Sequence, residues 1–221
     1  MHVIVSYDGT RNDRDGLALG RLFAAAGAKV SLAYVRHSPE REPEREAEVQ
    51  QESEHLLEVA AERLDGGAAG THVIFNPSTA EGLQSLAREL GADVIAFGSS
   101  YRTPPGSVGL PQTAENLIDA EAACSLAVAP AGLRREPVEH AIGSLSVYAE
   151  GEEAAAGASA DALAHALGAV VSGEDADMLL VASRADAPDG RLALSSRARE
   201  RIEQARCPVI ALAHGAVLSF S

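Results

Sequence analysis

Short apolar runs alternate with amphipathic segments along the first 130 residues of the chain. Each run has the length and the β-branched content of a buried strand, and a turn signal bounds it. Five strands are therefore predicted, at HVIVSY (2–7), KVSLAYV (29–35), THVIFN (71–76), DVIAFG (93–98) and SLAVAPAG (125–132).

The segments between these runs carry apolar residues at spacings of three and four, which predicts helices. Gly27 and Gly91 are plausible ends for the first and third of them. The charged run 38–50 is interpreted as a solvated loop and a first helical turn. The predicted apolar faces are Leu19–Leu22–Phe23–Ala26, Leu56–Val59–Ala60–Leu64 and Leu83–Leu86–Ala87–Leu90, with a fourth helix over 113–122.

Strands that alternate with helices of this length predict an α/β fold with a doubly wound, mostly parallel five-stranded sheet. Sheets of this kind bind ligands at the carboxyl ends of their strands, where the strand order reverses. The glycine- and serine-rich loop that follows residue 98 lies at such a position.

The pattern starts again after a charged, proline-containing linker at 133–140. ADVIAFGSS at 92–100 matches ADMLLVASR at 176–184, and Cys124 matches Cys207. Only 27 positions separate Glu150 from Asp177, against 85 between Asp8 and Asp93, so the second copy lacks the second helix, third strand and third helix. We therefore expect one domain at 1–132 and a truncated copy at 138–221, packed together as one body.

Composition narrows the class of protein. Hydrophobic residues make up 46% of the 221 residues, but aromatic residues only 4% with no Trp, so the predicted core is aliphatic. A net charge of −14 argues against nucleic acid and against an anionic membrane surface as partners. The start of the chain lacks the features of a signal peptide, and no apolar run reaches the roughly 18 residues of a membrane span. These features favour a cytoplasmic protein with two unpaired thiols.

Four features together resemble the universal stress protein family in a tandem form. They are VIVSYDGT at 3–10, ADVIAFGSS at 92–100, an amphipathic helix and cysteine before a final strand, and the recurrence of the whole block. The resemblance implies an α/β domain of the adenine nucleotide alpha hydrolase-like type, commonly dimeric, and binding ATP in some members. It also implies a role in the stress response.

The resemblance gives a phosphate motif against which the loop can be compared. ATP-binding members carry Gly, two residues, Gly, nine residues, then Gly followed by Ser or Thr. Here Gly98 is present, the second glycine position is Tyr101, and the third falls on Pro111 or, one residue later, on Gln112. Proline has no N–H to offer an anion, and a tyrosine prevents close approach of the backbone. The motif is degenerate in either register.

The family's binding residues carry over onto the ends of three strands and the loop. Asp8 would accept hydrogen bonds from adenine or ribose, or, alternatively, Asp8-Gly9 only makes a turn and caps the next helix. An adenine nucleotide with few phosphates, such as AMP, would tolerate the damaged loop better than ATP. The candidate residues are Asp8, Gly9, Thr10, Val35, Gly98, Ser99, Gly106, Ser107, Gln112 and Thr113.

The sequence supports no catalytic residue. The histidines are scattered without metal-ligand spacing, and FGSSY lacks the second glycine of a nucleophile elbow. We therefore expect a binding protein rather than an enzyme, with slow ATP hydrolysis ranked last. The two leading hypotheses are a weak adenine-nucleotide sensor and a scaffold that acts through its surface or self-association. The partner would be an unknown protein, with the two copies forming an internal pseudo-dimer that could dimerise further.

Overall fold

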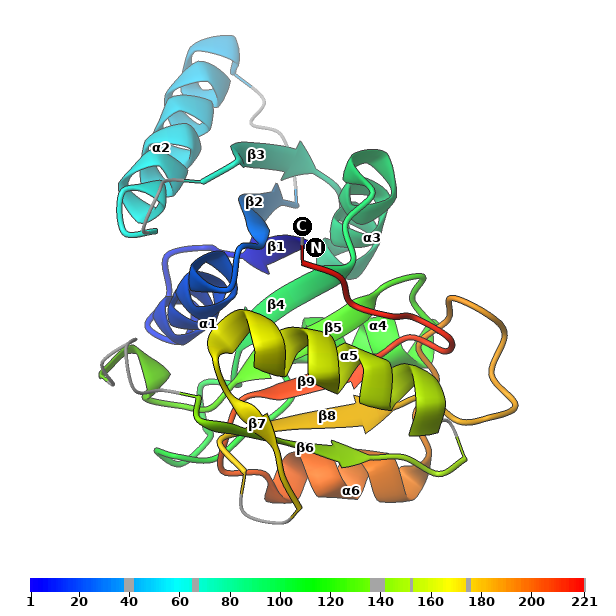
Figure 1. Ribbon diagram of the computed structural model, residues 1–221. Helices are drawn as coiled ribbons and strands as arrows, with labels where there is room; N and C mark the ends of the chain where they lie inside the picture. Colours follow the sequence, from blue (N-terminus) through cyan, green and yellow to red (C-terminus); the bar gives the residue numbers. More distant parts are fainter. Residues whose placement is uncertain (38–41, 65–67, 136–141, 152, 174–175, 221) are drawn as a thin grey trace.

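The computed structural model describes residues 1–37, 42–64, 68–135, 142–151, 153–173 and 176–220 (Figure 1). Strands and helices alternate through the first half. Their bounds are β1 His2–Ser6, α1 Asp13–Ala25, β2 Lys29–Arg36, α2 Pro43–Ala61, β3 Gly70–Phe75, α3 Thr79–Leu90, β4 Val94–Gly98, α4 Gln112–Asp119 and β5 Ser125–Ala129. A 3-10 helix η1 (Leu133–Arg135) precedes β6 Ser144–Tyr148, α5 Glu153–Leu167, β7 Val170–Val171, β8 Met178–Ala182, α6 Ser196–Gln204 and β9 Val209–Leu212.

All strands join one nine-stranded sheet with the order β3-β2-β1-β4-β5-β9-β8-β6-β7. Within each half the strands are parallel, and the halves meet through a single antiparallel pair, β5 with β9. The predicted α/β class and parallel five-stranded sheet are confirmed. The strand order reverses between β1 and β4, which sets the position of the site described below.

Helices cover both faces of the sheet. Successive residues of each strand point to opposite faces, so each strand contributes apolar side chains to both layers of helices. Val3 and Val5 of β1 belong to one apolar cluster, together with residues of α1, α2 and α5. Ile4 belongs to the other cluster, which α3, α4 and α6 complete. The core is built mainly from aliphatic side chains, as the composition predicts.

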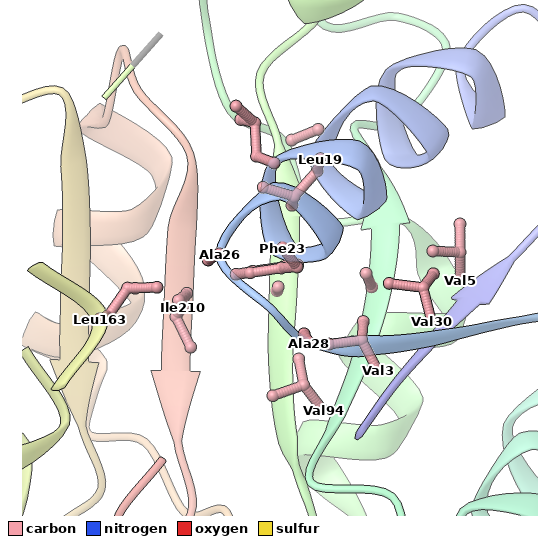
Figure 2. Close-up of a cluster of buried hydrophobic side chains, with 14 of the residues drawn as sticks. Val3, Val5, Leu19, Phe23, Ala26, Ala28, Val30, Val94, Leu163 and Ile210 are labelled. Atoms are coloured by element: carbon pink, nitrogen blue, oxygen red, sulfur yellow. The ribbon is translucent and has the colours of Figure 1, made fainter. Parts of the chain in front are cut away.

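The first of these clusters is continuous across the junction of the two halves. Figure 2 shows Leu19 and Phe23 of α1 in the same cluster as Ile210 of β9 and Leu163 of α5. The chain ends also lie near each other in Figure 1, and the amino group of Met1 donates to the Ser219 carbonyl. The second half therefore buries its apolar surface against the first.

Two predictions about individual elements need correction. The buried side of α2 carries Leu57, whereas Val59 is 38% exposed. The reason is that α2 packs mainly on the outer strands β2 and β3, so few of its residues are buried. The strand β7 was not predicted, since two residues are too few to show a period. Part of the predicted linker, residues 136–140, lies outside the described residues, and η1 forms its beginning.

Hydrogen bonds recur between the halves at matching positions. The hydroxyl of Ser99, after β4, donates to the Ala129 carbonyl (2.7 Å) and accepts from the Gly109 amide (3.1 Å). The hydroxyl of Ser183, after β8, donates to the Leu212 carbonyl (2.7 Å) and accepts from the Ala193 amide (3.0 Å). Each loop is fastened in the same way to the end of the neighbouring strand.

Candidate ligand site

A cavity of about 550 Å³ opens at the carboxyl ends of β1, β2 and β4. It lies where the strand order reverses, which is the usual position of a ligand site in an open parallel sheet. Its volume falls within the range of small-molecule sites. Tyr7, Val35 and Phe97 supply apolar wall, and Asp8, Asp13 and Ser100 supply polar groups.

The turn after β1 holds two carboxyl groups at the mouth of the cavity. Gly9 has φ +84°, a conformation that favours glycine, and it lets the Thr10 amide reach Asp8 Oδ1 at 3.0 Å. Asp13 Oδ2 accepts from the amides of Asp8 (2.7 Å) and Thr10 (3.2 Å). Asp8 thus forms the turn with one oxygen and remains exposed at the cavity, so the turn does not exclude a role in binding. The expected capping of the next helix by Asp8 is wrong, because the N-cap residue of α1 is Asn12.

Asp13 is half-buried beside Asp8, and its charge is correspondingly disfavoured. Two effects raise the pKa of Asp13 from 3.8 to about 7: burial is the larger, and the hydrogen-bonded carboxyl group of Asp8 is the next. Burial disfavours the ionised form, and a second carboxylate nearby repels it. Near neutral pH the pair therefore carries less than two negative charges, which suits a ligand that is itself an anion.

Only glycine fits at position 98, because β4 packs closely against the start of α1. A Cβ at this position would lie 1.9 Å from the Asn12 carbonyl oxygen. Gly16 meets the same strand from the helix side, since its Cβ would lie 2.8 Å from the Gly98 nitrogen. The Asn12 side chain also donates to the Ser99 carbonyl at 2.8 Å. Close contact between α1 and β4 accounts for Gly98 without any ligand.

The middle of the loop turns away from this cavity toward the second half of the chain. The Gly106 amide donates to the Ala131 carbonyl (2.8 Å), and the Val108 amide to the Ala205 carbonyl (3.2 Å). The Ser107 hydroxyl accepts from the Arg206 guanidinium. The backbone amides of Gly106 and Val108 are therefore engaged in contacts within the protein.

Two residues at the family's glycine positions leave the cavity open. Tyr101 lies on its rim with 78% of its surface exposed, and its hydroxyl accepts from the Arg102 side chain at 2.6 Å. Pro111 is the N-cap residue of α4, so the missing N–H lies just outside the helix. Thr113, in the first turn of α4, lines the cavity.

Of the ten residues predicted from the sequence, six line this cavity: Asp8, Thr10, Val35, Gly98, Ser99 and Thr113. Gly9 forms the turn beside it, and Gln112 begins α4. Gly106 lines a different cavity, and Ser107 joins the contact with Arg206.

Several cavity residues were missed by sequence reasoning. Arg11, Asn12 and Asp13 reach the cavity because the turn after β1 folds over the strand ends. Exposed His37 lies on the opposite rim, whereas Arg36 is buried and bonded to both carboxylate oxygens of Glu46. The polar run Arg11-Asn12-Asp13 was the available signal for the first group, since polar residues between a strand and a helix gather at the sheet edge.

At the matching position in the second half, the acidic side chain is hydrogen-bonded to two neighbouring hydroxyl groups. Glu150 follows β6 as Asp8 follows β1, and it accepts hydrogen bonds from the Ser195 hydroxyl and, at 3.0 Å, from the Tyr148 hydroxyl. Both hydrogen bonds lower the pKa of Glu150, and the bond from Ser195 has the larger effect. Gly151 has φ +104°, and a Cβ there would lie 3.2 Å from the Ala185 Cβ.

Other kinds of site are not found in the described part of the chain. No group of three or more His, Cys, Asp or Glu side chains there could hold a metal ion. Cys124 and Cys207 are free thiols, and burial raises the pKa of Cys124 to about 12. None of the helices that the structure describes combines the length and apolarity needed to cross a membrane.

The sheet order and the edge cavity define an open α/β protein with a ligand-sized cavity where the strand order reverses. The family model of the universal stress protein family matches residues 1–130. The chain belongs to the universal stress protein family, as its sequence features indicate.

Solved structures show that the fold extends over the whole chain. A universal stress protein from Archaeoglobus fulgidus DSM 4304 is 13% identical, covers 96% of this chain and 98% of its own, and has a TM-score of 0.72. A protein of unknown function from Pseudomonas aeruginosa PAO1 is 12% identical over 96% of this chain and 92% of its own, with a TM-score of 0.65. No curated protein sequence matches the chain.

Proposed function

We propose that this universal stress protein is a ligand sensor of the stress response whose cavity at the end of β1 binds an adenine nucleotide. The observation that carries the proposal is the open cavity at the reversal of the strand order, with Asp8 exposed on its wall. Tyr101 is turned to solvent and leaves the space free. Sensing is the first hypothesis because this space is available to a ligand.

The residues of the cavity match the parts of a nucleoside monophosphate. Asp8 is exposed on the cavity wall and accepts the Thr10 amide through Oδ1, and a carboxylate has further lone pairs that can accept from the adenine amino group or a ribose hydroxyl. Tyr7 and Val35 offer an apolar surface to the base. Thr113 in the first turn of α4, together with exposed Arg11, offers hydrogen bonds and charge to one phosphate.

AMP or a cyclic nucleotide is the preferred ligand over ATP. A longer phosphate chain would need the backbone amides of the loop, but those of Gly106 and Val108 are bonded within the protein. Pro111 offers no amide at all. The bond from the Val108 amide to the Ala205 carbonyl also favours the second hypothesis, a scaffold that binds a protein partner. Through this bond the loop holds the two halves of the chain together. We expect a binding protein of the cytoplasm rather than a catalyst.

We further propose that residues 138–221 are a shortened copy of residues 1–132, joined to them as an internal pseudo-dimer. Support comes from the strand pairing, because Val3↔Val94 and Ile4↔Ile95 recur as Leu145↔Met178 and Ser146↔Leu179. Support also comes from the matching bonds of Ser99 and Ser183.

Native mass spectrometry of the freshly purified protein, with calorimetric titration of ATP, ADP and AMP, tests the sensor. The proposal expects a retained adenine nucleotide or an AMP affinity in the micromolar range that exceeds that of ATP. A protein that carries no nucleotide and gives no heat with any of the three would overturn it and leave the scaffold.

A further inference from the structure

A second and larger cavity, of about 1170 Å³, lies beside α6 in the second half. Its floor is formed by Ser146 of β6 and Leu179 of β8, and α6 forms one wall with Arg201 and Gln204. Arg135 of η1 closes it from the side of the first half. The cavity therefore exists only because the two halves are joined.

In the first half a helix occupies the corresponding place. There α3 packs against α4 and over β2 and β4. In the second half the chain passes from Val171 of β7 to Met178 of β8 through only six residues, 172–177. No counterpart of α3 fits in this connection, so no helix of the described residues covers the floor beside α6.

Two residues that face the uncovered place are polar where their counterparts in the first half are apolar. The pairing register makes Ser146 the counterpart of Ile4, which is fully buried beneath α3 and α4. Along the helices, Ala114 and Ile118 correspond to Ala198 and Ile202, all buried, which makes exposed Arg201 the counterpart of buried Leu117. A helix with an apolar face like that of α3 would bury Ser146 and Arg201 without partners, which is costly.

Positive charge gathers in the cavity although the chain as a whole carries −14. Arg135, Arg201 and Arg206 line it, and none of them makes an ion pair with a carboxylate of the described residues. Arg206 donates to the Ser107 hydroxyl, and Arg201 lies 5.7 Å from the centre of the Tyr148 ring.

The single acidic residue among the described lining residues is already satisfied. Asp177 Oδ2 accepts from the amides of Gly143 (2.9 Å) and Ser144 (3.0 Å) and from the Ser144 hydroxyl (3.0 Å). Asp177 thus holds the start of β6 and does not neutralise the arginines by direct contact.

We propose that this cavity, the arginine groove of Arg135, Arg201 and Arg206, binds a small polyanion that carries several phosphate or carboxylate groups. Guanidinium groups recognise both anions through paired N–H donors and keep their charge at any physiological pH. Ser146 and Gln204 add neutral hydrogen-bonding groups to the same surface. The polar floor fits such a ligand better than it fits a helix of a partner.

Calorimetric titration of the full chain at low salt with tripolyphosphate and with citrate tests the groove and compares the two anionic groups. We expect binding that weakens at least about tenfold in the double variant Arg201→Gln/Arg206→Gln, the loss of two charge-assisted contacts. Ser146→Tyr, which fills the floor without a change of charge, should weaken it as well. Arg63→Gln, at an exposed arginine after α2 at the other end of the sheet, should leave it unchanged.

Arg11→Gln separates this proposal from the nucleotide site, because Arg11 offers its charge to the phosphate there and does not line the groove, so its loss should leave binding at the groove unchanged. The absence of heat with both anions at millimolar concentration would overturn the proposal. An equal loss in Arg63→Gln would also overturn it, since the effect would then be one of overall charge. Binding of a polyglutamate peptide but of neither small anion would contradict it and assign the groove to an acidic protein segment.

Discussion

Ala127 of β5 lies opposite Ile210 of β9, and the pairs on either side of them are reciprocal. Leu126 faces Ala211, and Val128 faces Val209. A shift of 83 residues, the spacing of Cys124 and Cys207, exchanges these two pairs. The Val108 amide bonds to the Ala205 carbonyl, and the Leu192 amide bonds to the Ala122 carbonyl in the same reciprocal manner. This is the geometry of a two-fold interface, formed within one chain.

The first prediction concerns the oligomeric state. Because β5 and β9 cover each other, neither offers a free edge to a second molecule, and the sheet ends at β3 and β7 instead. We expect the chain to sediment at its own mass of 22.8 kDa at micromolar concentration. Analytical ultracentrifugation measures this, and a stable species of twice that mass would show that another surface associates.

The second prediction concerns the pH dependence of stability at the site. The pKa of Asp13 is raised to about 7, so between pH 4 and 7 the folded chain holds a proton that the unfolded chain has released. The stabilisation from this proton is lost as pH rises through 7. Asp13→Asn keeps an oxygen for the amides of Asp8 and Thr10 and should raise Tm at pH 8 by at least about 2 °C.

Thermal unfolding of both proteins between pH 4 and 8 provides the test of Asp13. The difference in Tm between variant and parent should grow with pH and be smallest near pH 4. Parallel curves over the whole range would mean that Asp13 titrates like an ordinary carboxylate.

The third prediction concerns the loop and the length of the phosphate chain. The double variant Tyr101→Gly/Pro111→Gly would let the loop backbone approach the phosphates closely and would restore one backbone amide near the start of α4. One added charge-assisted hydrogen bond corresponds to an increase of about tenfold in ATP affinity. AMP affinity should change little, and titration of both nucleotides into the double variant provides the comparison. A gain for neither nucleotide would locate the defect in the segment Gly106–Val108.

The fourth prediction separates packing from ligand binding at Gly98. Gly98→Ala would force the Asn12 carbonyl away from β4 and cost about 1–3 kcal/mol in the free energy of unfolding, as overpacking does. Gly157, within α5, has no atom within 4 Å of an added Cβ. Gly157→Ala should therefore be stabilising by about 0.5–1 kcal/mol. Denaturant unfolding compares them, and equal effects would refute the packing role of Gly98.

Much of the fold follows from local patterns in the sequence. Each run such as 93–98 is a short apolar stretch bounded by turn signals, and the helix ends at Gly27 and Gly91 are local signals as well. Both glycines adopt positive φ in the structure. The strand β7 and the buried Leu57 of α2 escaped prediction because they depend on which neighbours lie against them.

The candidate site was predictable mainly at the strand ends, with Thr113 at the start of α4 as a further correct residue. Asp8, Val35 and Gly98 follow or end strands, so the topology brings them together. Asp13 reaches Asp8 through the fold of a turn, and Gly106 is drawn toward Ala131 by contacts between segments distant in sequence. The spacing predicted that the second half lacks a third helix, but which side chains line the space left by it follows only from the packing of the two halves.

Calorimetric titration of AMP into the parent protein and into Asp8→Asn tests the central claim most directly. The asparagine keeps an oxygen for the Thr10 amide, so the turn after β1 should be retained, while the loss of the negative charge and of one acceptor oxygen weakens binding. We expect micromolar affinity in the parent and a loss of about tenfold in the variant, equivalent to 1.4 kcal/mol. No binding by the parent, or equal affinity in both proteins, would contradict the account of a nucleotide sensor.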